Sequence, residues 1–153
     1  MRGRVDCTAL TTASVDALPQ ACDLAVIAVP AIDVPSAIEA CGRRGIRTAI
    51  VITSGFEEIE GGKAYSRQLV EATRHGCSTV VGPNSEGVWT IPGLAVLSHG
   101  SAARRERLVP GPVSVLSQSG SIGAATISRI QDWGIGCRFF VSVGNETLVN
   151  MLD

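Results

Sequence analysis

The chain alternates between short, continuous apolar runs and longer segments whose apolar residues recur at helical spacing. Continuous runs of about four to eight apolar residues, bounded by turn residues, are typical of strands that are buried on both faces. Such strands are expected over 23–30, 48–53 and 78–81. The first of these ends at Pro30 and is expected to be a central strand of a parallel sheet.

Helical segments separate these strands. A helix is expected to begin at Asp33 or Pro35 and to end at Gly42 and Gly45, because glycine commonly terminates a helix. A more polar helix is expected from about residue 62 to residue 75. Strand and helix therefore alternate, and the loops that follow the strands are rich in Pro, Gly, Ser and Asn. This order is typical of a doubly wound α/β domain, in which ligands collect at the carboxyl ends of parallel strands.

The alternation is interrupted over residues 88–111. A short hairpin or extended run with a turn at Pro92-Gly93 is expected there, followed by a solvated basic loop at 104–107. We interpret this segment as a connector to a second α/β unit. The expected elements of that unit are a strand at 113–116, a helix from about 120 to 133 and a strand at 137–143, and a further short strand is expected near the beginning of the chain at 5–10.

The segment Gly111–Ala125 combines the strand and helix signals of the second unit with a turn made of small residues. Ser117, Ser119 and Gly120 lie between the apolar run and the helical pattern. A strand that turns into a helix through serine and glycine directs free backbone N–H groups and the positive end of the helix dipole at one point, which favours an anion. A capped turn with Ser117 or Ser119 as the N-cap explains the same residues. Both interpretations remain open at this point.

Composition and charge narrow the class of protein. The chain has 153 residues, of which 45% are hydrophobic and 4% aromatic, and this balance suits a parallel α/β sheet. The net charge of −1 gives no electrostatic argument for nucleic acid or for an acidic membrane surface. With no run of transmembrane length and no apolar signal-peptide core at the N-terminus, the cytoplasm is the expected location. The five widely spaced cysteines are expected to be mostly buried apolar residues.

The chain matches no common catalytic motif. The first glycine of the nucleophile elbow G-x-S-x-G is missing before Ser119, and Gly61-Gly62-Lys63 lacks the upstream glycine of a P-loop. His75 is interpreted as a cation at a helix C-terminus and His99 as a loop residue. The acidic cluster Glu57, Glu58 and Glu60 is interpreted as solvated charge, and Trp89 and Trp133 as packing residues. The residues alone thus predict an α/β protein with a small anionic ligand but no reaction.

Several stretches resemble the NDP-forming acyl-CoA synthetases, of the ADP-forming acetate–CoA ligase type, and the α-subunit of succinyl-CoA ligase. They occur in the order of that family over roughly residues 15–153. The GPN and SQSG pieces are the most specific. The matching stretches are Asp23–Ala31, Val51–Glu57, Val81–Gly87, Leu116–Ser121 and Val141–Glu146.

The resemblance implies a fold, a division of the chain and a set of site residues. Residues 1–110 would be a Rossmann-like CoA-binding domain that lacks its first βα unit, together with the connector. Residues 111–153 would begin a flavodoxin-like ligase domain. Coenzyme A would be bound by Val29, Pro30, Thr53, Ser54, Gly55 and Asn84, and the phosphate of a phosphohistidine intermediate would be bound by Ser117, Ser119 and Gly120.

The resemblance also implies a reaction and its limits. The family interconverts acyl-CoA, phosphate and NDP with free acid, CoA and NTP. By this resemblance the phosphorylatable histidine lies beyond Asp153, and ATP or ADP and Mg²⁺ belong to an absent ATP-grasp portion, so no catalytic residue is assigned here. Glu86 departs from the family pattern, because an apolar residue or proline is expected at that position. A non-catalytic CoA-binding regulatory module, such as one fused to a protein acetyltransferase, and a poorly folding remnant are the alternative interpretations.

Overall fold

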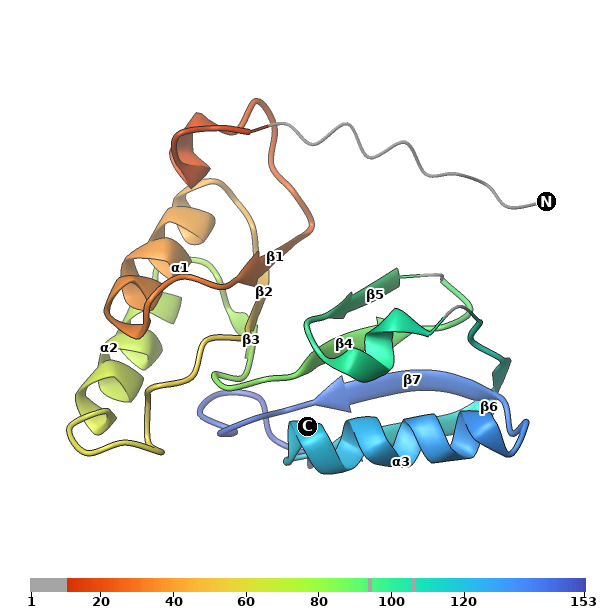
Figure 1. The fold of residues 1–153 in the computed structure, drawn as a ribbon. Coiled ribbons are helices and arrows are strands. Elements are labelled where there is room, and N and C mark those ends of the chain that lie inside the picture. Colours follow the sequence, from red (N-terminus) through yellow and green to blue (C-terminus); the bar gives the residue numbers. More distant parts are fainter. Residues whose placement is uncertain (1–10, 94, 106) are drawn as a thin grey trace.

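The computed structural model describes residues 11–93, 95–105 and 107–153, so the strand expected over 5–10 lies outside the described residues. The described chain forms two sheets, each with its own helices (Figure 1). No helix among these residues is long and apolar enough to cross a membrane.

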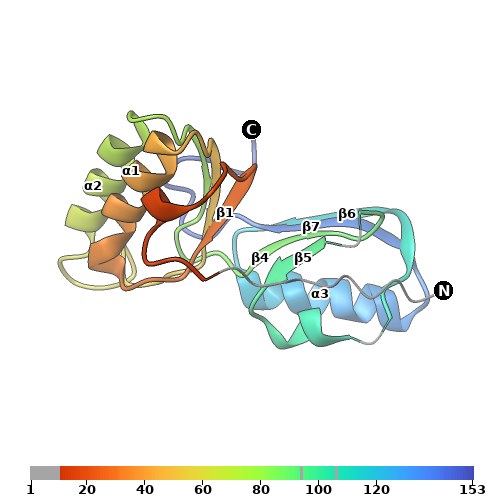
Figure 2. The ribbon, with the colours of Figure 1, turned by 90° about the horizontal axis from the view of Figure 1, so that it is seen from above.

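The first sheet has three parallel strands in the order β1-β2-β3. Its elements in chain order are the 3-10 turn η1 (Val15–Ala17), β1 (Leu24–Ile27), the 3-10 turn η2 (Ala31–Asp33), α1 (Val34–Arg43), β2 (Thr48–Val51), α2 (Lys63–Thr73) and β3 (Thr79–Val81). Both crossovers step in the same direction along the sheet. Because such crossovers are right-handed, α1 and α2 lie side by side on the same face (Figures 1 and 2).

Two expectations for the first sheet need correction. The strand expected to be central, β1, lies at the edge of the three described strands, and Val26 is 41% exposed. The helix α1 also continues through Gly42, and Gly45 follows it with φ of +76°. A Cβ atom at Gly42 would lie 2.3 Å from the carbonyl oxygen of His75. Gly42 therefore lets α1 pack closely against the segment around His75, and it does not end the helix.

The second sheet is mixed, with the order β5-β4-β7-β6. Its elements are β4 (Gly87–Thr90), β5 (Ala95–Ser98), the 3-10 turn η3 (Ser101–Arg104), β6 (Pro110–Ser117), α3 (Gly120–Asp132) and β7 (Cys137–Ser142). The expected strand, helix and strand are confirmed as β6, α3 and β7, with β6 and β7 parallel. The expected hairpin is confirmed as β4 and β5. It is part of the second sheet, because β4 pairs antiparallel with β7, and so it is more than a connector.

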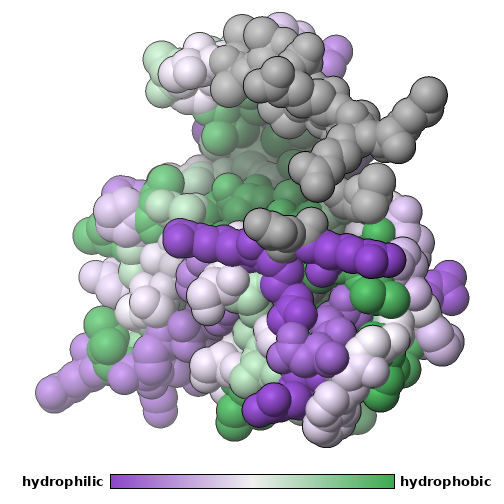
Figure 3. Space-filling view, turned by 45° about the vertical axis from the view of Figure 1, so that its right-hand side comes forward, coloured by the Kyte–Doolittle hydropathy of each residue, from purple (hydrophilic) through white to green (hydrophobic). Residues whose placement is uncertain are grey.

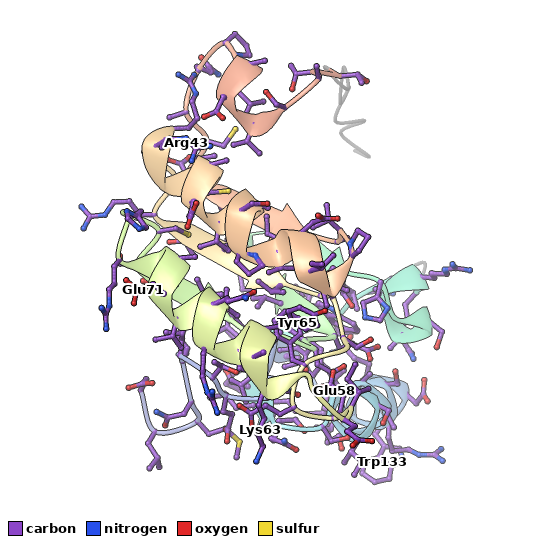
Figure 4. The ribbon with its side chains drawn as sticks, turned by 90° about the vertical axis from the view of Figure 1, so that its left-hand side faces the viewer. Arg43, Glu58, Lys63, Tyr65, Glu71 and Trp133 are labelled. Atoms are coloured by element: carbon purple, nitrogen blue, oxygen red, sulfur yellow. The ribbon has the colours of Figure 1, made fainter. Side chains whose placement is uncertain are left out.

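Each sheet has its own apolar core. In the first, Ile38, Leu69 and Phe56 are fully buried between the helices and the strands. In the second, Trp89 is fully buried and its ring meets that of Phe140 edge to face at 5.1 Å. Trp89 is thus the packing residue expected from the sequence. Trp133 is not, because it follows the last turn of α3, is 70% exposed and projects away from the helix bodies (Figure 4).

Candidate functional site

The loop between β3 and β4 joins the two sheets. The backbone N–H of Asn84 donates to the carbonyl of Thr53 (2.9 Å), which lies just after β2. On the other side, the hydroxyl of Ser85 donates to the carbonyl of Ser142 (2.5 Å), and the Ser142 hydroxyl accepts from the backbone N–H of Glu86 (3.0 Å). Ser85 and Ser142 are both buried. The loop is therefore fixed between the end of β2 and the end of β7.

The 82–87 loop and the segment after β7, which together we call the joint, also approach each other closely through their backbones. Gly144 has φ of +62°, and a Cβ atom there would lie 2.1 Å from the carbonyl oxygen of Pro83. The next backbone N–H, that of Asn145, donates to the same carbonyl at 2.9 Å. Only glycine allows the segment after β7 to lie this close to the 82–87 loop.

One open hollow of about 580 Å³ lies at the carboxyl ends of β1 and β2, and we call it the strand-tip hollow. Its walls are largely aliphatic, with hydroxyl and amide groups at one end. The Thr53 hydroxyl donates to the carbonyl of Val29 (2.7 Å) and ties the two strand ends together. The lining residues are Ala28, Val29, Pro30, Ala31, Ile52, Thr53, Ser54, Asn84 and His99.

A second hollow, of about 390 Å³, lies at the start of α3, and we call it the helix-start hollow. Its lining is mostly polar and consists of Asn84, Ser85, Glu86, His99, Gln118, Ser119, Gly120, Ser121, Gly144 and Asn145. Asn84 and His99 line both hollows, which therefore adjoin. On the face of the molecule drawn in Figure 3, a recessed hydrophobic area is bordered by hydrophilic side chains.

The start of α3 presents free backbone donors to the helix-start hollow. The hydroxyl of Ser119 caps the helix by accepting from the N–H of Ile122 at 3.4 Å. Among the described residues, the backbone N–H groups of 118–121 donate no hydrogen bond. Both sequence interpretations of this turn therefore apply, because the turn is capped and also keeps donors available for an anion.

Glu86 lies at the same point. A Cβ atom built on Gly120 would lie 2.6 Å from Cβ and 3.0 Å from Oε2 of Glu86, and one built on Gly100 would collide with its carboxylate. The side chain is thus packed between these two glycines, at the positive end of the α3 dipole. The sequence placed Glu86 near the site as a departure from the family, and the structure locates its carboxylate at the helix start.

A chain of side-chain hydrogen bonds connects the two sheets beside the hollows. The Asn84 amide donates to the side-chain oxygen of Asn145 (3.2 Å), and the Asn145 amide donates to Glu58 (2.6 Å). Glu58 lies on the loop that leads into α2 (Figure 4) and also accepts from the N–H of Gly55 at 2.7 Å. Burial acts to raise the pKa of Glu58. The hydrogen bonds from its own backbone N–H, from Asn145, and from the N–H groups of Gly55 and Phe56 outweigh burial and lower the pKa.

Most of the residues expected to contact a ligand line one of the two hollows, and two do not. The two hollows bring together Val29, Pro30, Thr53, Ser54, Asn84, Ser119 and Gly120. Two expected residues do not line either hollow. Gly55 holds Glu58 through its N–H, and the Ser117 hydroxyl donates to the carbonyl of Ser119 (2.7 Å) inside the turn.

Sequence reasoning missed three residues of this region. His99, expected to be a loop residue, lines both hollows, and Glu58, expected to be solvated charge, accepts hydrogen bonds. Asn145 lies in the family-like stretch Val141–Glu146, but the sequence alone predicts no role for it. A polar residue directly after a predicted strand end was the signal available for Asn145.

The acidic, histidine and sulfur-containing side chains of the described residues are candidate ligands for a metal ion. Within the described ranges, no three His, Cys, Asp or Glu side chains converge in a way that could hold an ion. Cys41, Cys77 and Cys137 are buried, as expected for most of the cysteines, and Cys22 is exposed. Burial, with a smaller contribution from Cys41, raises the pKa of the Cys77 thiol to about 11. Cys41, Cys77 and Cys137 are core residues of the fold.

Comparison with known proteins agrees with this architecture. Residues 7–55 match the CoA binding domain model, and residues 110–153 match the model of the succinyl-CoA ligase like flavodoxin domain. The α subunit of the ADP-forming acetate–CoA ligase I of Pyrococcus furiosus is 38% identical over 141 residues. This alignment covers 92% of the chain and 30% of the relative. The chain belongs to the NDP-forming acyl-CoA synthetase family.

Solved structures support the same assignment. The apo form of the dinucleotide forming acetyl-coenzyme A synthetase 1 of Ca. Korarchaeum cryptofilum matches with a TM-score of 0.82 and 33% identity, over 92% of this chain and 30% of that one. Its complex with phosphate and ADP matches with the same TM-score and 32% identity, over 92% and 29% of the two chains. The sequence-based fold assignment, a Rossmann-like parallel sheet followed by the beginning of a flavodoxin-like unit, is thereby confirmed. The chain spans about a third of the length of these relatives.

Proposed function

We propose that this chain forms the CoA- and phosphate-binding part of an NDP-forming acyl-CoA synthetase. The whole reaction would interconvert acyl-CoA, phosphate and NDP with acid, CoA and NTP. An ATP-grasp domain or subunit would supply the nucleotide site with its Mg²⁺, and the chain alone would not form acyl-CoA. A cytoplasmic location belongs to the same proposal, and so does a boundary in the sequence near residue 110, across which β4 and β5 pair into the second sheet.

The observation that carries the proposal is that two hollows of different chemistry adjoin at Asn84. The strand-tip hollow offers aliphatic walls from Val29 and Pro30 with a few polar groups, which suits the thiol-bearing arm of CoA. The helix-start hollow offers unbonded amides at a helix N-terminus, which suits phosphate. A thiol at the boundary would lie next to a bound phosphoryl group, as transfer between an acyl phosphate and CoA requires.

Calorimetric titration of the 153-residue chain with CoA tests the proposal. The informative variant is Asn84→Gly, because Asn84 has φ of 60°, which glycine adopts without strain, and the substitution removes only the side-chain amide. We expect CoA affinity to fall about tenfold, the usual effect of losing a hydrogen bond or two.

The matched control is Asn150→Gly. Asn150 lies outside both hollows and bonds locally to Asp153, so CoA affinity should stay within about twofold of wild type. Absence of heat with the wild-type chain, or equal affinities for both variants, would contradict the proposal. If CoA binds, an ATP-grasp sequence beside this chain would support the ligase. A neighbouring acetyltransferase would support the regulatory module.

A further inference from the structure

His99 lies at the boundary of the two hollows. It directly follows β5, and the pairing of β5 with β4 places Ser98 opposite Gly87. The hairpin therefore fixes the backbone position of His99. The Ser98 hydroxyl accepts from the N–H of Gly100 at 3.3 Å and further fixes the local backbone. The exposed side chain contributes to the lining of both hollows, and only Asn84 shares that property.

The lining of the helix-start hollow contains two side chains that can carry a charge. Among its lining residues, Glu86 is the one carboxylate and His99 the one side chain that can become a cation. A dianion that enters there meets the carboxylate at the helix start. The free N–H groups of residues 118–121 supply partial positive charge only. Full positive charge from the lining can come only from a protonated imidazole.

We propose that His99, as an imidazolium, binds a tetrahedral oxyanion such as phosphate at the boundary of the two hollows. Binding at the helix start is then linked to proton uptake, and Glu86 opposes it. This inference rests on the proposed function, since it adds a ligand-binding side chain to the phosphate site. His99 thereby becomes a contact that depends on pH, in contrast to the N–H groups of residues 118–121.

Few charged side chains lie beside His99 among the described residues that line the two hollows. Glu86, on the 82–87 loop, is the charged group in the lining of the helix-start hollow, and Arg105 lines a further hollow together with Glu86 and Ser121. The start of α3 contributes serine, glycine and glutamine, and the segment after β7 contributes Gly144 and Asn145. The strand tips contribute no ionisable side chain besides His99. Glu58 reaches this region only through Asn145.

Nuclear magnetic resonance of the full chain tests the inference directly. The chain has two histidines, so the ring signals of His99 and His75 can be followed separately. Sulfate is the probe, because it keeps two negative charges between about pH 5 and 8, the range in which imidazole changes charge. We expect saturating sulfate to raise the titration midpoint of His99 by about half a unit or more. His75, which lines neither hollow, should not respond.

Variants give an independent measurement of the same linkage. Wild-type affinity for sulfate should fall about fivefold as the pH rises from about 5.5 to 8. H99Q should abolish this dependence and bind weakly throughout. E86Q should bind sulfate about threefold more tightly, since one opposing charge is removed. The matched control H75Q should behave as wild type.

The outcomes separate the inference from the proposed function. If sulfate shifts the backbone amides of 118–121 but leaves the His99 midpoint unchanged, the phosphate site stands and the role of His99 is refuted. If sulfate shifts neither, both are refuted. An equal shift of both histidines indicates non-specific binding and also overturns the inference.

Discussion

The two hollows adjoin, yet they are built in different ways. The strand-tip hollow is walled by aliphatic side chains such as Val29 and Ile52, and its hydroxyl from Thr53 is already bonded to a backbone carbonyl. The helix-start hollow is lined by polar groups, and the N–H groups of 118–121 have no partner among the described residues. The strand-tip hollow therefore offers a ligand apolar contact area, and the helix-start hollow offers it electrostatic interactions.

This difference shows how a short chain can present two kinds of ligand chemistry at one place. Contacts with aliphatic walls depend on shape and change little with salt. Interactions with unbonded amides, with a helix dipole and with His99 depend on charge and are screened. Both hollows depend on the joint made by the 82–87 loop and the segment after β7. The comparison can be tested by disturbing that joint, by adding salt, and by weakening the side-chain network beside it.

The largest effect is expected from Gly144→Ala. The new Cβ atom would collide with the carbonyl of Pro83, and the residue would keep an unfavourable positive φ. We expect the free energy of unfolding, measured by urea denaturation, to fall by about 3 kcal/mol. Binding of CoA and of sulfate should weaken together, because the joint serves both hollows.

The control for this substitution is Gly134→Ala. Gly134 has φ of +73°, but a Cβ atom there would have no neighbour within 4 Å. Its cost should be that of the backbone conformation alone, about 1 kcal/mol. Equal losses of stability in the two variants would show that the close approach at Gly144 is not important.

A smaller effect is expected when salt is added. Raising sodium chloride from about 20 to 300 mM should weaken sulfate binding at the helix start about fivefold, since the charges become screened. Binding of uncharged pantetheine, the thiol arm of CoA, should change less than about twofold at the strand tips. Amide chemical shifts of 118–121 and of 29–31 and 52–54 report the two events separately. Equal salt sensitivity, or no shift with pantetheine, would contradict the distinction between the hollows.

Much of the fold could be predicted because its signals are local. Apolar runs and glycine stops give β2, α2, β6, α3 and β7 within a few residues of their observed bounds. The sheet to which a strand belongs is not determined by local signals. The hairpin at 87–98 was recognised, but its pairing with β7 depends on a strand that lies about 50 residues further along the chain. The position of β1 at the edge of the described strands is not predicted either, because a continuous apolar run does not reveal how many neighbours a strand has.

The site was predicted only where residue type was sufficient. Ser119 and Gly120 follow from the turn chemistry, and Asn84 was assigned through the family resemblance. His99 and Glu58 carry no local signal, since each is a polar residue in a loop. Their role arises from tertiary contacts, namely the placement of His99 at the end of the hairpin and the donation from Asn145 to Glu58.

The smallest effect concerns the network that Glu58 forms beside the hollows. Glu58→Gln keeps the shape of the side chain but loses its charge, and it should lower the free energy of unfolding by about 1 kcal/mol or less at neutral pH, because Glu58 is largely exposed. Burial acts to raise the pKa of Glu58, but the hydrogen bonds outweigh it and hold the pKa below its ordinary value, so the contribution is present above the pKa of the unfolded chain and is lost as pH falls through the folded value. Urea denaturation should therefore show a difference between wild type and variant at pH 7 that shrinks below about pH 4. Glu57→Gln, on the adjacent exposed residue, should show no such difference at either pH. A difference for Glu58→Gln that persists in acid would mean that the side chain acts through packing, and the network would then carry no electrostatic coupling between the two sheets.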